Sequence, residues 1–142
     1  MRAITGLIIH CTATRPTWMQ NARTSAKIAE VRRWHMKDRG WKDIGYHNLI
    51  DRDGTVGKGR PLEMIGSHTK GHNTGTIGIA LFGGWDSAET DTFDENYTPQ
   101  QDAALRKLIA EYRARFPTIK SVTGHNDWAS KACPGFDVGR WL

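Results

Sequence analysis

Apolar residues occur along the chain in short runs separated by polar segments, a pattern that predicts alternating strands and helices. Runs that are rich in β-branched residues, or that alternate with polar ones, predict strands. They cover residues 4–10, 46–51, 55–58, 77–82 and 119–123. Asp53-Gly54, between the second and third runs, is typical of a tight hairpin turn. We therefore expect one hairpin among strands that are otherwise separated by longer connections.

Two longer segments have the signals of helices. Thr24 or Ser25 can cap a helix that continues to about residue 39 and stops at Gly40. The string Thr98-Pro99-Gln100-Gln101 supplies a cap, a proline in the first turn and a glutamine that can bond back to the cap. One apolar stripe follows along this second helix and predicts a core face. It consists of Ala104, Leu105, Leu108, Ile109 and Tyr112.

The remaining segments are shorter. Residues 85–97 are acidic and predict a mobile loop, and residues 136–142 predict a short closing helix. Strands that alternate with helices, with one hairpin among them, favour an α/β fold with a mixed central sheet and helices on its faces. A length of 142 residues suits one domain, which we expect to span residues 1–142.

Composition and charge narrow the possible partners. The net charge of +5 favours an anionic partner, such as a nucleic acid, a membrane surface or an acidic cell-wall polymer. The basic residues are scattered, which is typical of solvated helix faces. No apolar run approaches the roughly 20 residues of a membrane-spanning helix, and the first residues lack the features of a signal peptide. We therefore expect the protein to stay in the cytoplasm in which it is made.

His10, His125 and Cys133 are the main candidates for chemistry. His10 closes the first apolar run, and His125 and Cys133 lie eight residues apart near the end of the chain. Open α/β sheets usually bind their ligands at the carboxyl ends of the strands, where we expect His10 and His125 to lie. Two imidazoles and one thiolate suit zinc and leave its fourth position open for a water molecule, as in catalytic zinc sites. The triplet predicts a zinc hydrolase.

The other cysteine and histidines are weaker candidates. Cys11 follows His10 directly, so in a strand its side chain points to the opposite face, and we expect a buried apolar role. His35 is expected on the surface of a helix, and His47 alternates with Tyr46 across a strand. Tyr46 is either a core aromatic residue or a catalytic one. Lys131, two residues before Cys133, is either a surface lysine or a cation that stabilises an oxyanion.

Several enzyme classes lack support in the sequence. The chain has no His-Glu-x-x-His string of helical zinc proteases. It also has no Gly-x-Ser-x-Gly elbow of serine hydrolases and no glycine-rich phosphate loop. Two other functions stay open: a module that binds its ligand without cutting it, and a nucleic-acid or polymerase-binding regulator. The complete ligand set argues against the first, and the absence of any nucleic-acid motif argues against the second.

Six segments, in order along nearly the whole chain, resemble the type-2 N-acetylmuramoyl-L-alanine amidases. That family shares its fold with peptidoglycan recognition proteins, and the resemblance is to its small phage endolysins of the T-seven lysozyme kind. The matching segments are Ile8-Ile9-His10-Cys11-Thr12-Ala13-Thr14, Gly45-Tyr46-His47, Arg52-Asp53-Gly54-Thr55-Val56, Gly66-Ser67-His68-Thr69-Lys70-Gly71, Ile77-Gly78-Ile79 and Ser130-Lys131-Ala132-Cys133-Pro134-Gly135-Phe136-Asp137.

The resemblance implies roles for seven residues. His10, His125 and Cys133 would hold Zn²⁺, and Tyr46 and Lys131 would be the catalytic pair. The substrate would be the amide that joins the lactyl group of N-acetylmuramic acid to L-alanine in peptidoglycan. By the same resemblance, His68 and Asn73 would bind the substrate, because they lie in a segment that lines the cleft in the family.

The resemblance also concerns partners and location. It implies a monomeric endolysin that waits in the cytoplasm of the infected cell and reaches the cell wall after the membrane is permeabilised. Some phage relatives also restrain transcription, which would make a phage RNA polymerase a second partner. Two departures stand out: the chain begins almost at its first strand, without the longer polar arm of the phage relatives, and its loop over residues 15–23 looks longer. Trp18 and Met19 in that loop are expected to alter the rim of the cleft.

Overall fold

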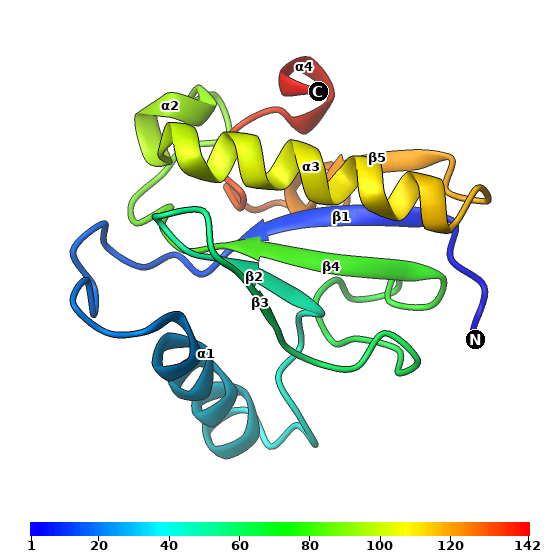
Figure 1. Ribbon diagram of the computed structural model, residues 1–142, viewed down its shortest axis with the longest axis horizontal. Helices are drawn as coiled ribbons and strands as arrows, with labels where there is room; N and C mark the ends of the chain where they lie inside the picture. Colours follow the sequence, from blue (N-terminus) through cyan, green and yellow to red (C-terminus); the bar gives the residue numbers. More distant parts are fainter.

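The computed structural model describes residues 1–142 and contains a five-stranded sheet with helices on both faces (Figure 1). The strand order is β3-β2-β4-β1-β5. All neighbouring strands are parallel except β2 and β3, which form the predicted antiparallel hairpin. The expected α/β fold with a mixed sheet is therefore confirmed. The strands are β1 (Gly6–Cys11), β2 (Asn48–Ile50), β3 (Val56–Lys58), β4 (Thr76–Leu81) and β5 (Ser121–Gly124).

The helices begin and end close to the predicted positions. The expected cap of the first helix by Thr24 or Ser25 is wrong, because Arg23 occupies the cap position without a side-chain cap bond and the Thr24 hydroxyl donates to Asp51 instead. Thr98 caps α3 through a reciprocal pair of bonds with Gln101, because the backbone N–H of each residue donates to the side chain of the other at 3.1 Å. None of the helices combines the length and apolarity needed to cross a membrane. The helical elements are α1 (Thr24–Arg33), the π-helical turn η1 (Trp34–Asp38), α2 (Phe93–Asn96), α3 (Pro99–Arg115), the 3-10 turn η2 (His125–Asp127) and α4 (Val138–Trp141).

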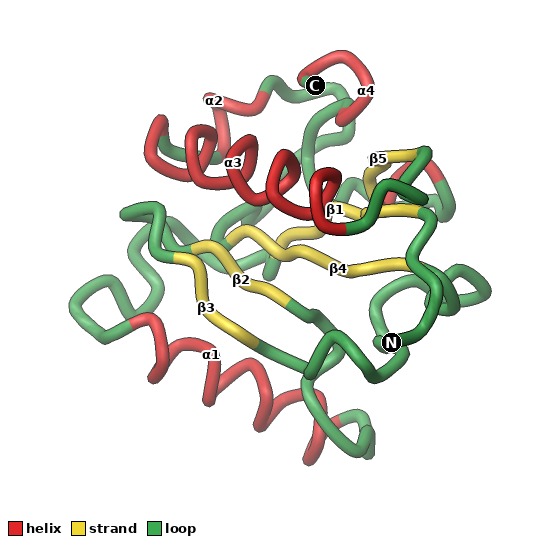
Figure 2. Tube along the Cα trace, turned by 45° about the vertical axis from the view of Figure 1, so that its right-hand side comes forward, coloured by secondary structure: helices red, strands yellow, loops and turns green.

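The two faces of the sheet have separate apolar cores. The larger core lies between the sheet and α3, and it takes Leu7, Ile9 and Cys11 from β1. Side chains alternate along a strand, so His10 points to the opposite face. Figure 2 shows α3, α2 and α4 on one side of the sheet and α1 on the other. Helix α3 contributes most of the predicted stripe to the larger core: Leu105, Leu108, Ile109 and Tyr112.

The smaller core lies between the sheet and α1. Ile28 and Val31 of α1 cluster with Leu49 of β2, Ala80 of β4 and Phe82, which directly follows β4. No residue of β1 or β5 belongs to this cluster. The helix thus covers only one half of this face, and the other half, around β1 and β5, is left for the loops that form the candidate site.

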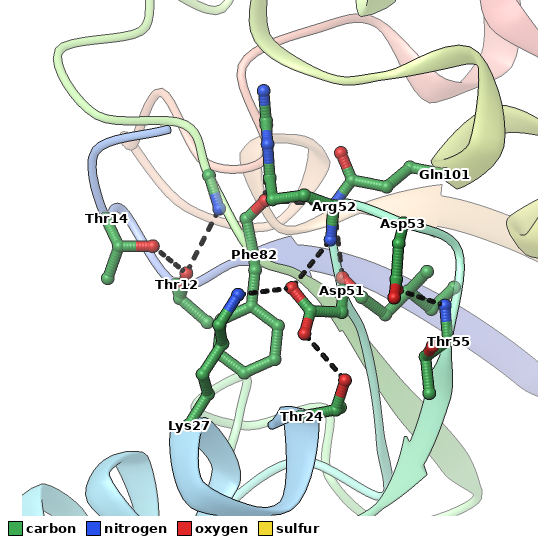
Figure 3. A network of polar contacts seen from close by, with 12 residues as sticks. Thr12, Thr14, Thr24, Lys27, Asp51, Arg52, Asp53, Thr55, Phe82 and Gln101 are labelled. Atoms are coloured by element: carbon green, nitrogen blue, oxygen red, sulfur yellow. Dashed lines mark hydrogen bonds and ion pairs between the residues drawn. The ribbon is translucent and has the colours of Figure 1, made fainter. Parts of the chain in front are cut away.

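A buried ion pair joins α1 to the β2–β3 hairpin (Figure 3). One carboxylate oxygen of Asp51 accepts a hydrogen bond from Lys27 Nζ at 2.7 Å, and the other accepts one from Thr24 Oγ1 at 2.6 Å. The backbone N–H of Arg52 donates to Asp51 as well, at 2.7 Å. Both carboxylate oxygens of Asp51 therefore accept hydrogen bonds, and these bonds offset the free-energy cost of burying the charge.

The structure differs from the sequence analysis over residues 85–97. The expectation of a mobile loop is wrong for the second half of this segment, which contains α2. Thr92 and Glu95 form a capping box there, with the Thr92 N–H donating to Glu95 at 2.6 Å. Phe93 and Tyr97 anchor the short helix because both side chains are buried in the larger core. The polar composition of the segment concealed these two anchors.

Candidate metal centre

His10, His125 and Cys133 come together at the carboxyl ends of β1 and β5. These strands pair in parallel, with Ile9 opposite Gly124, so the residues that follow them share one edge of the sheet. The imidazole centroids of His10 and His125 are 4.6 Å apart. Cys133 approaches from the segment between η2 and α4, and the ligand atoms of the three residues lie within 4.8 Å of one another. No other cluster of histidine, cysteine and acidic residues in the chain has this potential.

The surroundings keep both imidazoles neutral. His10 is 1% exposed, and this burial lowers its pKa well below the usual value, with further lowering by the charges of His68, His125 and Lys131. Burial, followed by the charge of Lys131, also lowers the pKa of His125. A neutral imidazole offers a lone pair to a metal ion. The two histidines are therefore in the protonation state that a metal site requires.

Cys133 has contacts that suit a metal-binding sulfur atom. Its Sγ accepts a hydrogen bond from the backbone N–H of Cys11 at 3.2 Å and lies 3.9 Å from His10 Nδ1. A hydrogen bond with the Cys11 thiol and burial raise the pKa of the Cys133 thiol, so without a metal it stays protonated. Cys11 itself is buried in the core beneath α3 and lies outside the candidate ligand group, as predicted.

A cleft with a volume of about 640 Å³ opens beside this centre. His125 and Lys131 border it directly, whereas His10 lies buried beneath. Three cations and no carboxylate line the cleft, so it favours an anionic or carbonyl-rich ligand. The lining residues are Arg39, Trp41, Ser67, His68, Thr69, Lys70, Asn73, His125, Trp128, Ala129 and Lys131.

Tyr46 contacts His10 but is not among the residues that line this cleft. Its ring centroid is 5.3 Å from that of His10, and its hydroxyl donates to the backbone oxygen of Cys11 at 3.5 Å. Burial raises the pKa of Tyr46, so its hydroxyl keeps its proton at neutral pH. Tyr46 borders a smaller cavity of about 120 Å³, which shares Arg39 with the main cleft. The tyrosine is therefore close to the candidate ligands, and its protonated hydroxyl can donate a hydrogen bond.

The two residues expected to bind substrate do line the cleft, but both also have internal partners. His68 is 8% exposed, and its Nδ1 is 3.0 Å from His10 Nε2. The side-chain oxygen of Asn73 accepts the backbone N–H groups of His68 at 2.9 Å and Thr69 at 2.8 Å. Asn73 thereby fixes the loop that carries His68.

Two expectations about other side chains are wrong. His35 is buried, and its Nδ1 accepts the backbone N–H of Gly45 at 2.8 Å. The position of His35 along the helix did not reveal that the segment before Tyr46 covers its imidazole. Trp18 packs against Trp34 and Phe82 in the smaller core, and neither Trp18 nor Met19 lines the cleft.

Several cleft residues were not anticipated from the sequence. Arg39 lies 5.2 Å over the ring of Trp41, and together they form one wall. Trp128 is 44% exposed and packs against His72, with the two rings tilted by 34° and their centroids 4.1 Å apart. Trp128 stands among polar residues between His125 and Lys131, where no periodic apolar pattern predicts a core position. This signal could have identified it as a surface residue that contacts a ligand.

Comparisons with known proteins agree with this geometry. Residues 1–136 match the family described as N-acetylmuramoyl-L-alanine amidase. The endolysin of Escherichia phage T7 is 43% identical over 135 residues, which is 95% of this chain and 83% of the relative. The endolysin of Klebsiella phage KP32 is 42% identical over 135 residues, with 95% and 83% of the two chains covered. The solved N-acetylmuramoyl-L-alanine amidase LysC from Clostridium intestinale has a TM-score of 0.74 at 30% identity, covering 99% of this chain and 83% of that one.

Proposed function

The chain belongs to the N-acetylmuramoyl-L-alanine amidase family, and from this premise we propose that it is a zinc-dependent phage endolysin. Its reaction would be hydrolysis of the amide between N-acetylmuramic acid and the L-alanine of the stem peptide. The observation that carries the proposal is the convergence of His10, His125 and Cys133 within 4.8 Å, beside a cleft that also contains Lys131. The phage endolysins among the relatives support the biological role.

The residues present fit a zinc ion. Two neutral imidazoles and a thiol that becomes a thiolate on binding are ligand types that zinc prefers, and three protein ligands leave one position open. When bound, zinc would polarise the amide carbonyl and lower the pKa of a water molecule to near neutrality. The Cys11 N–H, 3.2 Å from Cys133 Sγ, would stabilise the negative sulfur in that state.

Lys131 and Tyr46 supply the two side chains that could act on the reacting amide. The ammonium of Lys131 borders the cleft without belonging to the ligand group, so it can face the oxygen on which charge develops. Tyr46 keeps its proton because burial raises its pKa, so its hydroxyl can donate a hydrogen bond to an oxyanion. No carboxylate lines the cleft to serve as a general base.

The cleft also fits the charge of the proposed substrate. Stem peptides carry carboxylates, and Arg39, Lys70 and Lys131 supply positive charge along the lining. Trp41 and Trp128 add aromatic surface at the same cleft. These features favour a polymer that is polar, partly anionic and long enough to occupy an open groove.

The experiment that tests the proposal combines metal analysis with cell-wall digestion. The purified protein should contain one zinc per chain, and a chelator should abolish solubilisation of purified peptidoglycan until zinc is returned. A protein that binds peptidoglycan without ever solubilising it would instead be a binding module of the same fold. A chelator-resistant activity would contradict the metal dependence.

A further inference from the structure

His68 and Thr69 meet the candidate ligand His10 on the side away from Cys133. His10 Nδ1 faces the sulfur atom at 3.9 Å, whereas His10 Nε2 lies 3.0 Å from His68 Nδ1 and 3.1 Å from Thr69 Oγ1. The Thr69 hydroxyl is in turn 3.0 Å from His68 Nδ1. All three residues are buried, so water does not replace these contacts. The two nitrogens of His10 therefore have different environments.

The hydrogen bonds around His68 favour one tautomer of its ring, with the proton on Nε2. The Thr76 hydroxyl donates to the backbone oxygen of His72 at 2.7 Å, so its oxygen is free to accept from His68 Nε2 at 3.4 Å. With its proton on Nε2, His68 has an acceptor lone pair on Nδ1. The proton on His10 Nε2 then has an acceptor in His68 Nδ1 or Thr69 Oγ1. Either arrangement leaves the lone pair of His10 on Nδ1.

The backbone is shaped to keep His68 in this position. A Cβ atom on Gly78 of β4 would lie 2.5 Å from His68 Cδ2, so the glycine leaves the space in which the imidazole packs against the strand. The loop end is fixed by Asn73, whose side-chain oxygen accepts two consecutive backbone N–H groups, those of His68 and Thr69. These constraints hold the ring against His10 on two sides.

We propose that His68 is a positioning residue of the metal centre, which holds His10 in the tautomer and orientation that present Nδ1 to zinc. The inference rests on the proposed zinc function and gives His68 a role distinct from substrate binding. A histidine ligand whose second nitrogen donates to a fixed acceptor binds metal more tightly, because its orientation and tautomer are set in advance. Thr69 shares this role through its hydroxyl.

The test compares zinc affinity in variants of His68, measured by competition with a chromophoric chelator. His68→Ala removes one of the two acceptors and the ring that packs against His10, and it should weaken zinc binding by about 10- to 100-fold. His68→Asn places an amide oxygen near the position of Nδ1 and should recover most of that loss. His72→Ala, a matched control in the same loop, should bind zinc like the wild type because His72 contributes only its backbone oxygen to the network. Thr69→Val tests the shared hydroxyl if His68→Ala does not fold.

A second measurement separates positioning from general packing. Cobalt bound in place of zinc gives absorption bands that depend on thiolate and imidazole geometry, and we expect these bands to change in His68→Ala and to return in His68→Asn. Wild-type zinc affinity in His68→Ala, or equal losses in the alanine and asparagine variants, would overturn the inference. A wild-type protein that binds no zinc would instead overturn the proposed function.

Discussion

The two cysteines show how one residue position decides between a ligand and a core side chain. Cys11 and His10 are neighbours in β1 and therefore face opposite sides of the sheet. The Cys11 thiol packs in the apolar core, and its backbone N–H supports Cys133 Sγ. Substitution of the Cys11 side chain leaves that N–H in place, whereas substitution of Cys133 removes the sulfur itself.

Cys133→Ser should therefore lose most of its bound zinc, because a hydroxyl is a much poorer ligand than a thiolate. Cys11→Ser, the matched control, should retain zinc and activity. Metal content by atomic emission, together with circular dichroism to confirm folding, checks both variants. Equal metal loss in the two would show that the wrong cysteine has been assigned to the site.

Lys131 tests the chemistry separately from the metal. Lys131→Ala should keep its zinc and bind insoluble peptidoglycan, but its turnover should fall about a hundredfold or more, because the cation acts on charge that develops in the transition state. Lys107→Ala, on α3 at the opposite face of the sheet, should turn over at the wild-type rate. Turnover of cell wall by Lys131→Ala at the wild-type rate would mean that Lys131 is only a surface lysine.

Individual residues differ in how far the sequence can reveal their roles. The ligand candidates were recognisable because their residue types and their places after apolar runs are themselves chemical signals. The contact between His68 and His10 joins positions 58 residues apart and depends on the packing of a loop, which no local pattern encodes. The burial of His35 has the same cause, since its partner Gly45 belongs to a later loop.

At the level of elements, the hairpin turn and the cap of α3 were the most predictable features. Gln101 was expected to close a capping box, and it does so, but its side-chain nitrogen also donates to the backbone oxygens of Ile50 at 3.1 Å and Phe82 at 2.9 Å. The residue therefore bonds α3 to the end of β2 and to the residue that directly follows β4. The first role follows from a local string, whereas the second depends on tertiary packing.

The attachment of α1 to the hairpin gives a prediction about stability. Asp51→Asn should lower the free energy of unfolding by about 3–5 kcal/mol, because it leaves the charge of Lys27 buried without its partner. Asp53→Asn, in the same turn, keeps an oxygen for the Thr55 N–H and should change stability by about 0.5 kcal/mol or less. Urea unfolding monitored by tryptophan fluorescence measures both. Similar midpoints for the two variants would contradict the structural role of the ion pair.

For the molecule as a whole, buried histidines predict sensitivity to acid. Burial lowers the pKa of both His35 and His47 to about 4. An unfolded chain has histidine pKa values near 6.5, so between about pH 6.5 and 4 the unfolded state binds protons that the folded state does not. Stability is thus complete above this window and falls as the pH decreases through it, by up to about 1.4 kcal/mol per pH unit for each histidine.

Urea unfolding of the metal-free protein between pH 7 and 5 tests this prediction. The free energy of unfolding should decrease with pH, and His35→Gln should have a shallower pH dependence than the wild type. A free energy that stays constant over this range would show that these imidazoles are protonated as easily in the folded state as in the unfolded one.

The reaction itself is tested most directly by the chemical ends that the protein creates. Purified peptidoglycan should be digested with the zinc-loaded protein and the products identified by mass spectrometry. We predict new free amino groups on L-alanine, lactyl carboxylates on N-acetylmuramic acid and glycan strands of unchanged length. New reducing sugar ends, or cuts within the stem peptides or their cross-links, would contradict the assignment of this cleft to amide hydrolysis at the sugar–peptide junction.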